Sequence, residues 1–139
     1  MIGSILSGKK PLVSVTRATS IGEIAALLYS NRIGAVLVVE AGEILGLVSE
    51  RDICAGLHTH GTAILGVTAA DVMSSPVVTA GPAMTLAQAM ATMTDRRFRH
   101  LPVVEDGRIL GLVSIGDLVK CRIEEAESEA KAMKDYIAG

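Results

Sequence analysis

The sequence predicts an α/β (α+β) fold in which two pseudo-symmetric β-α-β-β-α units pack sheet to sheet, with an additional C-terminal helix. Three observations lead to this prediction: an internal repeat, the same order of strand and helix signals in each copy, and an apolar but almost non-aromatic composition. Half of the 139 residues are hydrophobic and only 2% are aromatic. Small aliphatic side chains and Met must therefore form the core, which suits close packing of helices on sheets.

The repeat is visible by eye. Residues 38–53 read VVEAGEILGLVSERDI and residues 103–118 read VVEDGRILGLVSIGDL, an offset of 103 − 38 = 65 residues. The two copies span about residues 11–57 and 76–121. Because like units expose like apolar faces, each copy is expected to cover the face that the other leaves open.

This repeat suggests three segments. Residues 1–67 form the first unit with an N-terminal segment, residues 68–121 form the second unit, and residues 122–139 form an amphipathic helix. The second unit is expected to begin with a short helix over residues 69–73, which the Thr68 hydroxyl can cap.

Within each copy, a short apolar strand precedes a helix that opens with a capping box, Ser20-Ile-Gly-Glu23 or Thr85-Leu-Ala-Gln88. A buried strand, a Gly turn and a third strand then form a hairpin, and a second helix begins at Ser49 or Ser114. In chain order, the expected strands cover residues 12–15, 35–39 and 44–48 in the first copy, and 77–79, 101–104 and 109–113 in the second.

The composition argues against nucleic acid and membrane partners. The net charge is −2 and aromatic side chains for base stacking are nearly absent. The apolar runs end well short of the roughly 20 residues that cross a bilayer, and the first ten residues are too short for a secretory signal. Cys54 and Cys121 are expected to be reduced, buried thiols, which indicates a cytoplasmic protein.

Several motifs, taken together and in order, resemble a tandem pair of CBS domains, the module named after cystathionine β-synthase. The resemblance runs to about Lys120 and implies a free-standing pair that encloses two clefts between the repeats. In the family, such clefts commonly hold adenine nucleotides and pairs often form flat dimers. The motifs are Asp71-Val-Met73 before Pro76-Val-Val-Thr79, Arg99-His-Leu-Pro-Val103, and Gly-Leu-Val-Ser-x-x-Asp at 46–52 and 111–117.

Two Ser-x-x-Asp segments, Ser49 to Asp52 and Ser114 to Asp117, allow two interpretations. In the first, each is a capping box that satisfies a helix N-terminus. In the second, which the resemblance implies, each Asp binds a ribose. Two vicinal hydroxyls match two carboxylate oxygens, and the helix start offers N–H groups to an anion.

Four basic side chains, Arg96-Arg97-Phe-Arg99-His100, separate a helix end from a buried strand. Arg96 and Arg97 are explained as cations at a helix C-terminus. Arg99 and His100 lead into the strand, where the resemblance implies contact with phosphate. Pro102 lacks an N–H and marks a strand start or edge in this binding segment.

The first copy departs from this pattern, because Gly34 and Ala35 replace Arg99 and His100. Arg51 compensates only in part, so the second copy is expected to bind phosphate more tightly. The base would occupy an apolar slot, although most of its lining is expected to be core. The candidate lining residues are Val13, Val15, Val36 and Val38 in the first copy and Val78, Leu101 and Val103 in the second, and Thr79 is a further candidate for ligand binding.

The tail carries a heptad stripe with apolar residues at steps of 4, 3, 4, 3 and 4. Such a helix either packs on its own domain or contacts a partner, and a second copy of the chain is the favoured partner. The stripe consists of Val119, Ile123, Ala126, Ala130, Met133 and Ile137.

The sequence therefore favours a non-catalytic regulatory module that senses energy state through an adenine nucleotide, AMP before ADP or ATP, and acts as a homodimer on an enzyme that the sequence does not identify. The alternative is a ligand-independent adaptor that docks an enzyme through its C-terminal helix. The sequence contains neither a phosphate loop nor His-Glu-x-x-His nor Gly-x-Ser-x-Gly, which argues against an enzyme. Cys54 and His58 share a helix face, but without a second ligand cluster no metal is expected.

Overall fold

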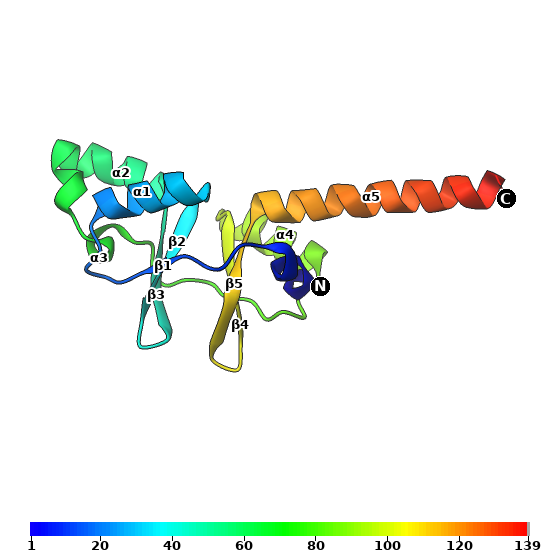
Figure 1. Ribbon diagram of the computed structural model, residues 1–139, viewed down its shortest axis with the longest axis horizontal. Coiled ribbons are helices and arrows are strands. Elements are labelled where there is room, and N and C mark those ends of the chain that lie inside the picture. The colour runs from blue at the N-terminus through cyan, green and yellow to red at the C-terminus, as the bar shows by residue number, and fades with distance from the viewer. Residues whose placement is uncertain (139) are drawn as a thin grey trace. The chain divides into compact units, whose positions relative to one another are not determined.

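The computed structural model describes residues 1–138, which form two compact units (Figure 1). The first-copy unit comprises residues 11–78, and the second-copy unit combines residues 1–10 with the chain from Thr79 onward. The compact units therefore do not follow the repeat boundaries, since the first ten residues belong to the unit of the second copy.

The first-copy unit contains a three-stranded sheet in the order β1-β2-β3. Strand β1 (Ser14–Val15) pairs in parallel with β2 (Ala35–Glu40), which pairs antiparallel with β3 (Glu43–Ser49). The helices are α1 (Ile21–Asn31), α2 (Glu50–His60), the 3-10 helix η2 (Gly61–Gly66) and α3 (Ala69–Val72).

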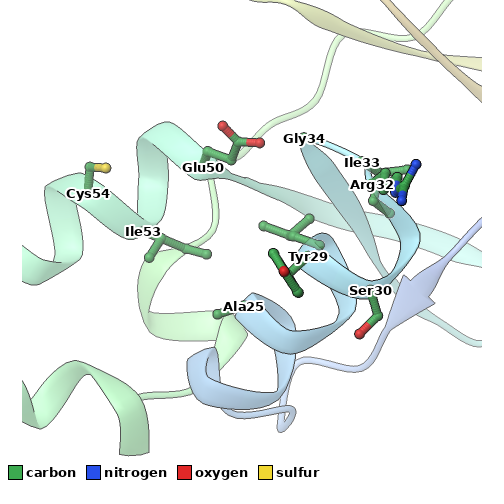
Figure 2. Close-up of a pocket in the computed structure, with 10 residues that line it drawn as sticks. Ala25, Tyr29, Ser30, Arg32, Ile33, Gly34, Glu50, Ile53 and Cys54 are labelled. Carbon is green, nitrogen blue, oxygen red and sulfur yellow. The ribbon is translucent and has the colours of Figure 1, made fainter.

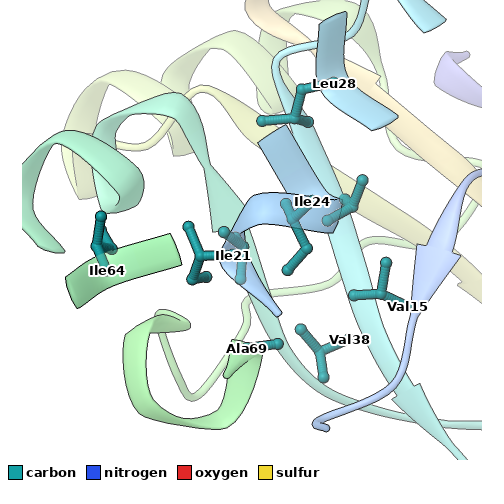
Figure 3. Close-up of a cluster of buried hydrophobic side chains, with 9 residues drawn as sticks. Val15, Ile21, Ile24, Leu28, Val38, Ile64 and Ala69 are labelled. Atoms are coloured by element: carbon teal, nitrogen blue, oxygen red, sulfur yellow. The ribbon is translucent and has the colours of Figure 1, made fainter. Parts of the chain in front are cut away.

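Aliphatic side chains from these strands and helices form the core of the first-copy unit (Figure 3). The inward face of α1, alternate residues of β2 and Val48 of β3 meet there, as the helical and strand periodicities predict. The members of the cluster are Val15, Ile21, Ile24, Leu28, Val36, Val38, Val48, Ile64 and Ala69.

The second-copy unit repeats the helix–hairpin–helix order of the first but has a smaller sheet. It contains the 3-10 helix η1 (Ile2–Gly8), α4 (Leu86–Arg96), the antiparallel pair β4 (His100–Glu105) and β5 (Arg108–Ser114), and α5 (Ile115–Ala138). The predicted strand over residues 77–79 is wrong: that segment reaches the sheet only through one bridge, between Ala80 and Val103.

Pro102 explains the missing strand. In the first copy, Ser14 and Val15 pair with Leu37 and Val38, and Pro102 occupies the position of Leu37 in the repeat. Proline has no N–H, so one of the parallel ladder bonds cannot form. The backbone keeps two bonds, from Ala80 N to Pro102 O (2.9 Å) and from Val104 N to Ala80 O (2.8 Å).

The predicted helix starts are confirmed at three N-caps, of which two are capping boxes. In the boxes Thr85–Gln88 and Ser49–Asp52, each side chain accepts a hydrogen bond from the backbone N–H of the other residue. At the predicted Ser20–Glu23 box only half of the pattern is present: the Ser20 hydroxyl accepts from the Glu23 N–H (3.2 Å). The expected cap by Thr68 is wrong, because its hydroxyl donates to the Asp71 side chain (2.9 Å) and caps no N–H.

Both hairpins turn on two residues with positive φ, Ala41-Gly42 and Asp106-Gly107. This is the backbone of tight hairpin turns that match the twist of the strands, and it explains the Gly at the second position.

The expectation of two buried thiols is wrong. Cys54 is exposed and Cys121 is half-buried. Only Gly56 of α2 and only Leu118 of α5 are fully buried, so most side chains of these helices face outward. In the part of the chain that the structure describes, no helix has both the length and the apolar character needed to span a membrane.

Candidate functional site

The start of α5 gathers most of the site residues predicted for the second copy. His100 lies opposite Ser114 in the β4–β5 register, and the Ile115 N–H donates to the carbonyl of Arg99 (2.8 Å). We call Lys9, Arg99, His100, Ser114 and Asp117 the Asp117 corner. The Lys9 and Asp117 side chains meet in this corner, and the backbone places Arg99 and His100 next to the start of α5 within the same unit.

The Ser114-x-x-Asp117 segment is a capping box, as predicted. The Ser114 N–H donates to Asp117 Oδ2 (2.8 Å), and the Asp117 N–H donates to Ser114 Oγ (3.1 Å). These bonds fix the carboxylate at the positive end of α5. The capping bond from the Ser114 N–H and the Lys9 contact both use Oδ2, and the other oxygen, Oδ1, lies outside the cap. The cap therefore leaves half of the carboxylate available.

Lys9 is a member of this corner that the sequence analysis missed. Its ammonium donates to the Leu112 carbonyl (2.8 Å) and forms an ion pair with Asp117 Oδ2. Lys9 directly follows helix η1, which two backbone hydrogen bonds attach to the second-copy unit: the Ile2 N–H donates to the Met84 carbonyl (2.8 Å) and the Gly3 N–H donates to the Pro82 carbonyl (3.0 Å).

The electrostatics of the corner favour an ionised Asp117. Partial burial raises the pKa of this carboxyl. The hydrogen bond and charge of Lys9, together with the bonds from Ser114, lower the pKa by more, so it lies below the ordinary value of 3.8. The carboxylate is therefore charged at neutral pH and can accept from sugar hydroxyls.

The first-copy unit has a matching arrangement with different chemistry, which we call the Asp52 corner: Gly34, Ala35, Ser49, Asp52 and Ser74. Ala35 lies opposite Ser49, and the Glu50 N–H donates to the Gly34 carbonyl (3.0 Å). The backbone is thus the same as in the other corner, but the positions of Arg99 and His100 carry no charge or imidazole.

Both oxygens of Asp52 are occupied by its own unit. Oδ2 accepts from the Ser49 N–H (2.9 Å) and hydroxyl (3.0 Å), and Oδ1 accepts from the Ser74 hydroxyl (2.7 Å). Ser74 is held there by two backbone bonds to Leu47. Ser74 was not predicted as a site residue, and it occupies the repeat position that Lys9 has in the other corner.

The remaining predicted site residues are scattered. Arg51 is exposed in the first turn of α2, and Pro102 is fully buried inside β4. Val15 and Val36 belong to the core of the first-copy unit, which agrees with the expectation that most slot residues are core. Val78 is half-buried and Thr79 is exposed, and they fall in different compact units.

A shallow groove of about 770 Å³ lies between α1 and α2 of the first-copy unit and borders the Asp52 corner at Gly34 (Figure 2). Tyr29 and Ala25 of α1 line one side, and Glu50, Ile53 and Cys54 of α2 line the other. It includes none of the predicted ligand residues. Within residues 1–138, no group of three or more His, Cys, Asp or Glu side chains could hold a metal ion.

Comparisons with known proteins agree with the duplicated architecture. The family model described as "CBS domain" matches residues 2–59 and again residues 69–124. The chain is 33% identical over 117 residues to the CBS domain-containing protein CBSX3, mitochondrial, of Arabidopsis thaliana, covering 81% of this chain. It spans little more than half, 57%, of that relative's length.

Two solved structures are similar over most of the chain. The CBS-domain containing protein ATU1752 from Agrobacterium tumefaciens is 40% identical, with a TM-score of 0.83 over 87% of this chain and 98% of that one. The CBS domain protein PAE2072 from Pyrobaculum aerophilum, solved in complex with AMP, is 28% identical, with a TM-score of 0.73 over 84% and 88%. The chain belongs to the CBS domain family and carries the domain twice, as a tandem pair.

Proposed function

We propose that this CBS pair is a non-catalytic regulatory module of the cytoplasm that binds an adenine nucleotide, with AMP the preferred ligand and energy sensing its role. The observation that carries the proposal is the Asp117 corner. There, a charged carboxylate with one oxygen outside the cap stands at a helix N-terminus, and the backbone of Arg99 and His100 adjoins the same helix start.

The two ends of a nucleotide match this corner chemically. Oδ1 of Asp117, which lies outside the cap, can accept hydrogen bonds from the vicinal hydroxyls of a ribose. Arg99 is exposed, and its guanidinium can form a bidentate pair of hydrogen bonds with a phosphate. Lys9 adds a second positive charge to the same corner.

The relative from Pyrobaculum aerophilum supports the choice of ligand, since its structure was solved in complex with AMP. AMP is therefore the first ligand to test, followed by ADP, ATP and adenosine. GMP is the matched control, because it keeps the ribose and phosphate and changes only the base.

The Asp52 corner is proposed to be the weaker site. A sugar there must displace the Ser74 hydroxyl from Asp52 Oδ1, where it sits at 2.7 Å, and it meets no Arg or His at positions 34 and 35. Losing a charged phosphate contact lowers affinity on the order of tenfold to a hundredfold.

A thermal melt tests the proposal. AMP at 100 times its dissociation constant should stabilise the protein by about 2.7 kcal/mol, and GMP should shift the melting temperature less. Native mass spectrometry of the same sample would report bound nucleotide and subunit number together. If none of AMP, ADP, ATP and adenosine shifts the melt or appears in the spectrum, the proposal falls.

An adaptor that uses α5 to dock an enzyme, or a second copy of the chain, is the alternative function. It is favoured by one observation: every described residue of α5 beyond Cys121 is exposed. Deleting residues 122–139 separates the two functions. A nucleotide sensor keeps its thermal shift with AMP after the deletion, whereas an adaptor shows no such shift before or after and loses its partner.

A further inference from the structure

We propose that α5 pairs with α5 of a second copy as a parallel, in-register two-stranded coiled coil centred on Ala126 and Ala130. This gives orientation and register to the homodimer considered above. The inference does not depend on whether the protein binds nucleotide.

The first observation is an apolar stripe that nothing in residues 1–138 covers. Ile123, Met133 and Ile137 are 53%, 62% and 77% exposed. Figure 1 shows α5 continuing well past α4 and β5 of its own unit. The predicted alternative, that the tail packs on its own domain, is therefore wrong for residues 122–138. A soluble helix with such a face is marginal until a partner covers it.

The second observation is the placement of β-branched residues in the heptad. With Ile123 as position a, the a positions are Ile123, Ala130 and Ile137, and the d positions are Val119, Ala126 and Met133. Isoleucine at a is typical of parallel two-stranded coiled coils. The two Ala layers in the middle bring the helices close together but bury little area, so the coil is expected to be weak alone.

The charges that flank the stripe determine the orientation. In a parallel pair, each g residue faces the e residue five positions further along the other helix. Arg122 then faces Glu127 of the second copy, and Glu129 faces Lys134 of the second copy. Both pairings are between opposite charges, and two-fold symmetry repeats each of them on the other side of the coil.

The antiparallel arrangement that buries the same six stripe residues is disfavoured by the same charges. There, e faces e and g faces g. Glu127 meets Glu127 of the second copy, Glu129 meets Glu129, and Lys120 meets Lys134. Every pairing of two charged residues in that arrangement is repulsive. The charges therefore stabilise the parallel form and destabilise the antiparallel one.

One local contact competes with the coil. Arg122 forms an ion pair with Glu125 on its own helix, with Nη1 and Oε2 3.7 Å apart. Both side chains are more than half exposed, and such surface pairs contribute little. The Arg122 side chain can therefore turn to Glu127 of a second copy at small cost.

Cysteine crosslinking in the full chain tests orientation and register. In a Cys54→Ser, Cys121→Ser background, Ala126→Cys should form a disulfide-linked dimer with a mild oxidant, because identical d positions meet only in a parallel, in-register pair. Ser128→Cys, at the outward f position, is the matched control and should stay monomeric on a non-reducing gel. Linkage only between mixed Ala126→Cys and Ala130→Cys chains would show the antiparallel form and overturn the proposal.

Charge exchange provides an independent readout by sedimentation equilibrium. Arg122→Glu alone should weaken the dimer about tenfold, and adding Glu127→Arg should restore it. A dimer that sediments normally in all these variants, without an Ala126→Cys crosslink, would place the homodimer interface elsewhere and overturn this proposal alone. Since residues 122–138 are exposed in the single chain, circular dichroism should confirm that each variant folds.

Discussion

Lys9 and Asp117 lie 108 residues apart in the sequence, and their side chains form an ion pair at the start of α5. The exposed fractions of the two side chains are 32% and 26%, so the pair is partly shielded from water. The same ammonium donates to the Leu112 carbonyl. The N-terminal segment is thus fastened to the second-copy unit through the carboxylate that we propose holds the sugar.

Replacing Lys9 should destabilise the protein in a pH-dependent way. We expect Lys9→Met to lower the free energy of unfolding by about 1 kcal/mol at pH 6–7, the upper range for a partly exposed pair. The folded-state pKa of Asp117 is depressed, so the stabilisation is present above the ordinary value of 3.8 and is lost as pH falls through the lower folded pKa. The difference between wild type and variant should therefore shrink in acid.

Urea unfolding at pH 6 and at a pH well below 3.8 measures this difference. Lys10→Met is the matched control, because Lys10 is exposed and forms no ion pair within the described residues. A Lys9→Met effect that stays constant into acid would mean that Asp117 is not the group stabilised by Lys9.

Asp117 and Asp52 should differ in their effect on nucleotide binding. Asp117→Asn keeps the size of the side chain but removes the charge, and we expect AMP to bind on the order of tenfold to a hundredfold more weakly. Asp52→Asn should change the affinity of the tighter site for AMP little, because Asp52 belongs to the other corner and both of its oxygens already accept hydrogen bonds there. Calorimetric titration of each variant with AMP measures the two losses of affinity. A larger loss with Asp52→Asn than with Asp117→Asn would assign the tighter site to the first copy.

Arg99 should matter for the phosphate and not for the nucleoside. Arg99→Met is expected to weaken AMP binding about tenfold while leaving adenosine binding nearly unchanged. Arg96→Met is the control, since Arg96 lies in the last turn of α4 and is explained as a helix-terminal cation. Equal losses for AMP and adenosine with Arg99→Met would show that Arg99 acts on the fold and not on phosphate.

Much of the fold could be predicted because its signals are local. The hairpins, the capping boxes and the starts of α2 and α5 are each encoded within a few residues, and the repeat shows each of them twice. Even the absent strand at 77–79 had a local cause, since Pro102 removes an N–H that the parallel ladder needs.

The composition of the two corners could be predicted only in part. Ser114 and Asp117 were predicted from the Ser-x-x-Asp segment, and Arg99 and His100 from the resemblance to CBS domains. Strand register and a helix start explain why these four residues lie in neighbouring segments of the fold. Lys9 and Ser74 were missed because they arrive from segments far away in the sequence, through packing that no short motif encodes. The exposure of Cys54 was missed for a similar reason, since a short apolar helix does not reveal how much of it is covered.

The packing that delivers Ser74 and Lys9 leads to a last prediction, on two equivalent glycines. A Cβ at Gly46 would lie 2.5 Å from the Met73 sulfur and 2.9 Å from the Ser74 carbonyl oxygen, whereas a Cβ at Gly111 would meet only the end of the Leu6 side chain, at 2.8 Å. Ser74 cannot retreat without breaking its backbone bonds to Leu47, but the Leu6 side chain can rotate. We expect Gly46→Ala to lower the free energy of unfolding by about 2–3 kcal/mol and Gly111→Ala by about 1 kcal/mol or less, measured by urea unfolding. Equal losses in the two variants would mean that the Ser74 backbone moves away from the new Cβ as readily as the Leu6 side chain does. Ser74 would then be held less firmly against Asp52 than its hydrogen bonds imply.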